Sequence, residues 1–254
     1  MSPAGYQQLA DVLRAAILRG ELAAGATLPR LTDLAAQHGV AVLTARRAVA
    51  VLESEGLVEA VRRRGTVVRS QPPRRRIRRD RSVHRDERGY YFDAAAQPWM
   101  AVETPTVSWN SAPADIAALL DIEPGAEVLV RDRVMGATTD NPLQLATSYL
   151  PADVARGTVL EHPDTGPGGI YDRLEEMGHQ PLRWSETLGA RMPLHHEARA
   201  LHLPPGVPLL RILRTTTNPA GRVLEINDTR VSAALFEISY PLQRHRTAQH
   251  PHDG

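Results

Sequence analysis

Residues 31–69 read LTDLAAQHGVAVLTARRAVAVLESEGLVEAVRRRGTVVR, and this stretch decides the fold of the N-terminal part of the chain. Apolar residues at helical spacing predict a short helix over Leu31–Gln37 and a longer one over Leu43–Glu55. Between them lies Gly39, which can adopt a positive φ and close a tight turn. Two short helices joined by such a turn are typical of a helix-turn-helix motif.

A hairpin and one more helix complete the predicted module. The runs 57–61 and 66–69 are rich in valine and flank an arginine-rich turn that ends at Gly65, which predicts two antiparallel strands. Upstream, apolar residues at i, i+3, i+4, i+7 and i+8 predict a helix over Tyr6–Arg19. We therefore expect residues 1–70 to form one compact module of three helices and a hairpin, with the helix-turn-helix motif inside it.

The polar residues of this module suit DNA. Thr44 and Arg46 lie near the N-terminal end of the second helix, which in such motifs enters the major groove. An arginine at this place can bond guanine O6 and N7 together, which is worth roughly 1–3 kcal/mol of base discrimination. The hairpin arginines can contact phosphates or the minor groove. The alternative is an ordinary bundle, because three short helices with a small turn also occur in other proteins.

The charge of the chain is divided unevenly between its two parts. Residues 1–81 contain 15 Arg and 7 Asp or Glu, a net charge of +8, whereas residues 82–254 contain 15 Arg and 22 Asp or Glu, a net charge of −7. This asymmetry favours a polyanionic partner for the first part. The alternative is a solvated basic linker, since nine of the first fifteen arginines lie between Arg62 and Arg79.

Several function classes are excluded or disfavoured. The chain has no cysteine, which excludes disulfides and Cys-ligated metals. It also has no run of eighteen apolar residues that could span a membrane, and its N-terminus lacks the pattern of a signal peptide. We therefore expect a cytoplasmic protein without a membrane association. The spacing of His195, His196 and His202 matches no standard ligand set, and no acid–base pair is evident. We expect no metal, no cofactor and no catalytic residue.

The rest of the chain predicts a linker and a second domain. Residues 71–88 are rich in Arg and Pro and are expected to bury little as a linker. Residues 89–241 alternate between helical and strand patterns, which favours an α+β domain with a largely antiparallel sheet. The strands are expected at 128–135, 143–149, 184–192, 209–217 and 224–231, with helices at 114–120, 169–177 and 195–201. The tail, 242–254, is expected to be disordered.

The N-terminal motifs resemble a known family. The residues Tyr6-Gln7-Gln8-Leu9, Gly20-Glu21-Leu22, Leu28-Pro29 and Leu52-Glu53-Ser54-Glu55-Gly56-Leu57-Val58 stand in the order and spacing of GntR-superfamily winged helix-turn-helix domains. The resemblance implies DNA contact by Thr44, Arg46, Arg64, Gly65 and Thr66. It departs from the family at Thr32 and Val42, where arginine is usual, and at Arg30, where serine is usual and the arginine could reach phosphate. The complete set of expected DNA-binding residues is Arg30, Thr32, Thr44, Arg46, Arg47, Arg62, Arg63, Arg64, Gly65 and Thr66.

The second half resembles the UTRA domain of the HutC-type branch of that superfamily. The supporting runs include Arg131-Asp132-Arg133, Ser148-Tyr149-Leu150-Pro151 and Gly206-Val207-Pro208-Leu209. The resemblance implies a chorismate-lyase-like antiparallel sheet with flanking helices, dimerisation through this domain and a small-molecule effector. The implied effector pocket contains Arg131, Arg133, Gly169, Tyr171, Glu186, Arg214 and Glu225.

Two features of the implied pocket bear on its ligand. Arg131 and Arg133 alternate along one strand, so they share a face and could hold one anion together. The alternative is an exposed strand with salt bridges. A carboxylate common in the family is replaced here by Ala146, and a common tyrosine by Val231, so we expect a more apolar effector than a sugar phosphate.

These observations predict a homodimeric transcription repressor that binds a palindromic double-stranded operator under effector control. A lyase is the alternative that the second domain's fold suggests, but a lyase would not need residues 6–69. A repressor without an effector is the third possibility.

Overall fold

The computed structural model describes residues 4–70, 74–79, 82–85, 91–92, 100–138 and 140–242. By internal contacts the chain divides into two compact units. The first comprises Met1–Pro73, Ala190–Leu209 and Ser232–Leu235, and the second comprises Arg74–Gly189, Leu210–Val231 and Phe236–Gly254. Two segments from the second half of the sequence thus belong to the first unit, and the second unit begins within the expected linker.

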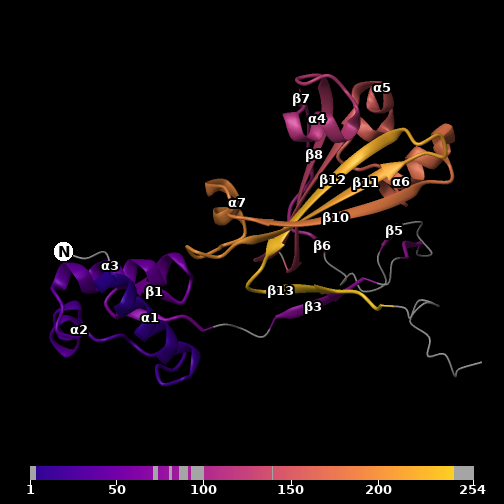
Figure 1. Cartoon of the computed structure of the whole chain (residues 1–254). Helices are drawn as coiled ribbons and strands as arrows, with labels where there is room; N and C mark the ends of the chain where they lie inside the picture. The colour runs from indigo at the N-terminus through magenta and orange to yellow at the C-terminus, as the bar shows by residue number, and fades with distance from the viewer. Residues whose placement is uncertain are drawn as a thin grey trace, which may run out of the picture. The chain divides into compact units, whose positions relative to one another are not determined.

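The first unit contains the predicted winged helix-turn-helix (Figure 1). Its apolar faces form one core to which Leu13, Leu34, Leu52 and Val58 contribute, and none of these four residues is more than 5% exposed. A spacing of three and four residues places these side chains on one face of each helix, so the helices can pack without burying polar groups. The elements are α1 (Ala4–Leu18), α2 (Leu31–Gln37), α3 (Val42–Ser54), β1 (Val58–Val61) and β2 (Gly65–Val68).

The turn between α2 and α3 has the predicted glycine conformation. Gly39 has a φ of 62°, and the Val40 N–H donates to the Ala35 carbonyl at 3.0 Å. Val40 packs against the core of the helices. Helix α2 has the predicted bounds, and α3 begins and ends one residue before its predicted bounds.

The loop before α2 holds the hairpin in place. The Gly25 N–H donates to the Val68 carbonyl and the Leu28 N–H donates to the Thr66 carbonyl, both at 2.8 Å. Thr27 also forms an isolated antiparallel bridge with Val67. The loop therefore runs beside β2 and fixes the hairpin to the helices.

The segment Ala190–Leu209 contains the short helix α7 (His195–Ala200). The Glu197 carboxylate at its first turn is fully buried and accepts two hydrogen bonds of 2.6 Å from Arg191. It also accepts a bond of 2.8 Å from the Leu194 N–H. A buried carboxylate with three donors fixes the start of this helix.

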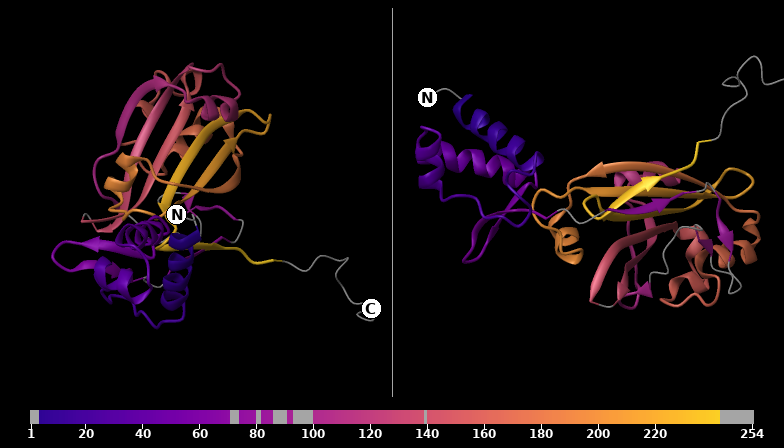
Figure 2. Two further views of the ribbon diagram at one scale, coloured as in Figure 1. Left: turned by 60° about the vertical axis from the view of Figure 1, so that its left-hand side comes forward. Right: turned by 90° about the horizontal axis from the view of Figure 1, so that it is seen from below.

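The second unit is built on one antiparallel sheet, whose long strands lie side by side in the left view of Figure 2. The strand order is β10-β11-β12-β9-β8-β6, and β7 also pairs with β8. All five strands predicted for this part of the chain are present. The strands are β6 (Met100–Ala101), β7 (Thr106–Ser111), β8 (Glu127–Thr138), β9 (Asn141–Pro151), β10 (Arg183–Arg191), β11 (Leu209–Thr217) and β12 (Val223–Ser232).

Helices cover both faces of this sheet. On one face, α4 (Ala114–Leu120) packs through Ile116 against Val130 and Ile226. On the other, Leu160, Ile170 and Leu174 pack against Leu129 and Leu150. The second group of helices consists of α5 (Ala152–Ala155), η1 (Val159–Glu161), α6 (Gly169–Leu174) and the irregular turn η2 (Glu175–His179). Helix α6 is shorter than predicted because the chain continues into η2, in which Gly178 has a φ of 94°.

Part of the predicted linker is a strand. Strand β3 (Arg75–Arg78) pairs in parallel with β13 (Phe236–Ser239) in the second unit, and the Arg79 N–H donates to the Ser239 carbonyl at 2.7 Å. The expected linker over 71–88 therefore contains a strand at residues 75–78, which the sequence did not predict. A second short pair is formed by β4 (His84–Arg85) and β5 (Tyr91–Phe92).

Two remaining expectations concern the tail and membranes. Of the predicted tail, only residue 242 is described, and residues 243–254 lie outside the described residues. Within the described ranges, the structure contains no helix with the length and apolarity that a membrane crossing requires.

Candidate functional site: a nucleic-acid interface and a ligand pocket

The N-terminal end of α3 presents polar side chains to solvent. Arg46 and Arg47 are exposed, and Thr44 is half-buried. The opposite side of the helix carries Ala45 and Ala48, which are fully buried in the core. A helix held on one face with arginines on the other can place these arginines in a major groove.

The tip of the hairpin is equally exposed. Arg62, Arg63 and Gly65 are all open to solvent, and Arg63 adopts a left-handed φ of 66° that the sequence does not predict. Arg64 is also exposed, but its Nη2 donates to the Gly25 carbonyl at 3.1 Å. The tip thus carries two arginines for which no protein hydrogen bond is described and one that fastens the wing to the preceding loop.

The other predicted DNA-binding residues lie in the same unit. Arg30 precedes α2 and is exposed, and Thr32 is exposed in its first turn, where its hydroxyl donates to Asp33 at 3.2 Å. Thr66 is half-buried beside the loop that holds the wing. All ten predicted residues are therefore at least partly open to solvent, as contact with DNA requires.

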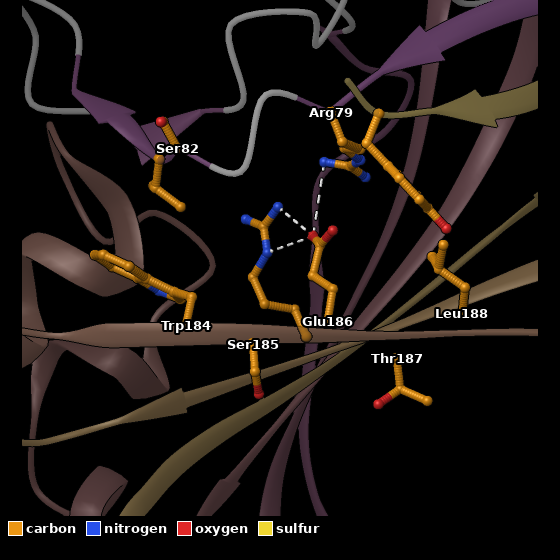
Figure 3. Close-up of a pocket in the computed structure, with 10 residues that line it drawn as sticks. Arg79, Ser82, Trp184, Ser185, Glu186, Thr187 and Leu188 are labelled. Atoms are coloured by element: carbon orange, nitrogen blue, oxygen red, sulfur yellow. Dashed lines mark hydrogen bonds and ion pairs between the residues drawn. The ribbon is translucent and has the colours of Figure 1, made fainter. Parts of the chain in front are cut away.

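A cavity of about 580 Å³ lies in the second unit. Its wall is formed by β10, by β11 and by residues next to β3 and β13, as Figure 3 shows for the labelled side chains. The lining combines apolar surface with two arginines and one carboxylate. The lining residues are Arg79, Ser82, Val83, Trp184, Ser185, Glu186, Thr187, Leu188, Arg214 and Tyr240.

Glu186 is the centre of the pocket's charges. Its Oε1 accepts from Arg214 Nε at 2.9 Å and from Arg214 Nη2 at 2.7 Å, and Arg79 Nη1 lies 3.6 Å from the same oxygen (Figure 3). The three side chains are between 15% and 24% exposed. Burial alone would lower the pKa of Arg214, but the neighbouring Tyr171 and Glu186 raise it overall. The group of three therefore carries one net positive charge.

Tyr171 and Glu225 lie behind Arg214. The Tyr171 ring meets the Trp184 ring edge-on at a centroid distance of 5.5 Å. Burial raises the pKa of the Tyr171 hydroxyl to about 12, so the hydroxyl is neutral at physiological pH. Glu225 is almost fully buried and accepts from Thr216 Oγ1 at 3.0 Å. These contacts bring four of the seven predicted residues, Tyr171, Glu186, Arg214 and Glu225, into one cluster.

Arg131 and Arg133 share a face of β8, as predicted, but have different partners. Arg131 is 3% exposed and donates to the carbonyls of His162 at 2.6 Å and Pro163 at 2.9 Å, as well as to that of Leu160. Burial, together with the charge of Arg133, lowers the pKa of Arg131 to about 10. Arg133 donates to Ser148 Oγ at 2.7 Å. Arg131 thus holds the loop before α6 rather than standing exposed in a strand.

The backbone conformation at Gly169, the first residue of α6, favours glycine. Gly169 has a φ of 66°, and its N–H donates to the Gly166 carbonyl at 3.2 Å. A positive φ favours glycine, so this residue sets the direction of the helix that carries Tyr171.

Sequence reasoning missed the residues that close the pocket from the ends of the domain. Arg79, Ser82 and Val83 belong to the expected linker, and Tyr240 to the expected end of the domain. Nothing in a run of arginines distinguishes Arg79 from its neighbours, because its partner Glu186 is distant in sequence. Among the described residues, no group of three or more His, Cys, Asp or Glu side chains has a geometry that could hold a metal ion.

Comparisons with known proteins identify two family regions along the chain. The model for bacterial regulatory proteins of the gntR family matches residues 5–68, and the model for the UTRA domain matches residues 101–237. The HTH-type transcriptional regulator SCO4628 of Streptomyces coelicolor is 34% identical over 92% of this chain and 91% of its own length. The HTH-type transcriptional repressor NagR of Bacillus subtilis is 26% identical over 87% of each chain.

Solved structures show the same architecture. The crystal structure of a GntR-family transcriptional regulator has a TM-score of 0.71 and 30% identity over 96% of this chain and 99% of its own. PhnF from Mycobacterium smegmatis, at 23% identity, shares the fold with a TM-score of 0.51 over 93% of this chain and 100% of its own. The matched families are those of regulators and not of enzymes. The chain therefore belongs to the GntR family of bacterial transcription regulators and joins a GntR helix-turn-helix DNA-binding domain to a UTRA effector-binding domain.

Proposed function

We propose that the protein is a homodimeric, cytoplasmic repressor that binds a palindromic operator and changes its operator affinity when a small organic acid enters the pocket around Glu186. A two-fold dimer presents two copies of α3, and a palindrome presents two matching half-sites. The name of the relative NagR, a transcriptional repressor, supports repression.

The exposed arginines on α3 and on the wing are the observation that supports DNA reading most strongly. Arg46 belongs to a helix whose other face is locked in the core, so its direction is fixed. Arg62 and Arg63 extend from a hairpin that hydrogen bonds to the loop before α2 hold in place. We assign base contact to Thr44 and Arg46. The assigned backbone contacts are those of Arg30, Thr32, Arg47, Arg62, Arg63, Arg64, Gly65 and Thr66.

The test of DNA reading is selection of bound duplexes from random double-stranded DNA by the purified protein. We expect a palindrome with two half-sites, and Arg46→Ala should lose the preference for a base in each half-site by roughly 1–3 kcal/mol. Arg222→Ala is the matched control, because Arg222 is exposed and paired with Asp153 in the second unit. Tight binding without any base preference would refute reading by α3.

The lining of the pocket indicates the class of effector. The apolar surface of the pocket comes from Val83, Trp184, Leu188 and Tyr240. Its two positive charges, on Arg79 and Arg214, face only one carboxylate of the protein, that of Glu186. An acid with an apolar body satisfies both parts, since its carboxylate can bond the arginines while its body covers the Trp184 side. Arg131 and Arg133 are not among the residues that line the cavity. Because of their different partners, we assign Arg131 to the support of the loop before α6 and Arg133 to a hydrogen bond with Ser148. Gly169, Tyr171 and Glu225 support the helix and the strand behind Arg214.

Benzoate and inorganic phosphate serve as probes of this pocket. At a concentration of one hundred times its Kd, benzoate should stabilise the protein by about 2.7 kcal/mol, seen as a rise in Tm, and phosphate should do less. Arg214→Met should remove the benzoate effect, and the matched variant Arg222→Met should keep it. Stabilisation by phosphate alone would refute the apolar acid as the ligand class, and an equal benzoate effect in both variants would place the ligand elsewhere.

A further inference from the structure

The loop that follows α7 contacts the C-terminal end of α3 within the first unit. Gly206 has a φ of 78°, and a Cβ at this position would lie 2.8 Å from the carbonyl oxygens of Glu53 and Ser54 and from the Gly56 nitrogen. Real Cβ atoms do not approach backbone this closely, so only glycine fits. The backbone of the loop therefore touches the backbone of the helix end directly.

Arg69 makes a second contact between the loop and the wing. Its Nη1 donates to the Pro205 carbonyl at 3.0 Å, and its Nε lies 3.8 Å from Glu59 in β1. The Arg69 side chain is 10% exposed. Arg69 is the first residue after β2, so one guanidinium joins the base of the wing to the loop.

The loop itself is stiff. Pro204, Pro205 and Pro208 restrict its backbone, and the Leu203 N–H donates to the Ala198 carbonyl at 2.7 Å. The helix before it is fixed by the buried pair of Glu197 and Arg191. A stiff loop can transmit a displacement, whereas a flexible loop would absorb it.

The contact leaves the DNA-reading residues uncovered. Thr44 and Ser54 are ten residues apart on α3, which separates them by roughly 15 Å along the helix axis at about 1.5 Å per residue. The loop meets the end of the helix near Ser54, and Arg46 and the wing tip stay exposed. The contact can therefore orient the reading helix without blocking it.

We propose that Leu203–Pro208 is a docking loop that orients the winged helix for its operator, with Gly206 and Arg69 as positioning residues. The loop is then a contact that the winged helix makes within the first unit, in addition to the covalent connection after Arg69. The loop lies between β10 and β11 in sequence, the strands that carry Glu186 and Arg214. In the proposed dimer, the orientation of each winged helix sets the distance between half-sites that the protein accepts.

This inference rests on the proposed binding of the operator by a dimer. Measuring the affinity for operators with different half-site spacings tests the docking loop and the dimeric binding separately. The full chain is titrated with the selected operator and with operators whose half-sites are moved by one or two base pairs. The wild type should prefer the selected spacing, and Gly206→Ala should reduce this preference by about tenfold, a size typical of coupling between sites. Its preference for bases within a half-site should remain.

Three variants separate positioning from a loss of folding. Gly221→Ala is the matched control, because Gly221 also has a positive φ, 81°, but no atom within 4 Å of a Cβ. Arg69→Ala should reduce the spacing preference as Gly206→Ala does, whereas Glu59→Gln, which removes only the wing partner of Arg69, should not. If Gly206→Ala fails to fold, Arg69→Ala carries the test.

The outcomes are distinguishable. If the wild type, Gly206→Ala and Arg69→Ala all prefer the same spacing, the role of the docking loop is refuted and the proposed function is unaffected. A wild type that binds all spacings equally contradicts the dimeric operator reading and overturns both. Loss of preference in Gly206→Ala and Arg69→Ala, but not in the two controls, supports the docking loop.

Discussion

Replacing Arg63 by glutamine should lower the salt dependence of operator binding by an amount that the structure allows us to work out. Arg63 is exposed at the tip of the wing, and no protein partner is described for it. Glutamine keeps a long polar side chain and the left-handed backbone strain, so the substitution removes mainly the charge. The change therefore isolates the phosphate contact that we assign to Arg63.

Each phosphate contact changes the slope of log K against log salt by about 0.9, so two wings per dimer change it by about 1.8. Between 50 and 200 mM salt, a fourfold range, this difference amounts to a factor of about 12 in the loss of affinity. Fluorescence anisotropy of a labelled operator duplex across this range measures both slopes. The variant should bind more weakly at low salt and approach the wild type at high salt.

Arg19→Gln is the control for net charge. Arg19 is exposed in the same unit but paired with Glu21 at 2.7 Å. Its loss should leave the slope unchanged. An unchanged slope in Arg63→Gln, or an equal change in both variants, would show that the wing does not lie on the phosphates.

Three further predictions concern stability. Leu52→Ala removes a fully buried side chain from α3 and should cost about 2–5 kcal/mol in denaturant unfolding. Because burial raises the pKa of Tyr171 to about 12, the unfolded chain loses this proton first as pH rises above about 10. The free energy of unfolding should therefore fall by roughly 2 kcal/mol more between pH 10 and 12 in the wild type than in Tyr171→Phe, and equal pH profiles would disprove this assignment. Glu197→Gln should lower the free energy of unfolding by roughly 2–3 kcal/mol, which is less than for a fully buried ion pair because the partner Arg191 is a third exposed. Glu237→Gln, at the exposed pair with Arg76, is the control and should lower it by less than about 1 kcal/mol.

The local sequence pattern was sufficient to predict those elements that depend only on residues close together in the chain. The turn at Gly39 and the bounds of α2 follow from apolar spacing and one glycine, because both depend on contacts a few residues apart. Strand β11 has its predicted bounds for the same reason. Strand β3 could not be predicted, since RRIR lacks the apolar alternation of a strand and its partner β13 lies far along the chain.

The residues of the candidate pocket also divide into those that could be predicted from the sequence and those that could not. Glu186, Arg214, Tyr171 and Glu225 were predicted by resemblance, and the structure places them in one cluster. The role of Arg131 could not be predicted, because its acceptors are backbone carbonyls of a loop whose path the sequence does not reveal. Arg79 was hidden in a run of similar residues, and only the tertiary fold shows which of them meets Glu186.

The pairing of β3 with β13 has a consequence for the order in which the protein is completed during synthesis. Paired residues of the two strands, such as Arg76 and Glu237, are separated by 161 positions, which a ribosome covers in about 8–30 s at bacterial rates. Residues 1–70 leave the ribosome first and can fold while β13 has not yet been made. Each new molecule thus passes through a period in which its DNA-binding helices exist without a closed ligand pocket, because Arg79 and Tyr240 meet only after both strands are present. During synthesis the helix-turn-helix is therefore complete before the ligand pocket is.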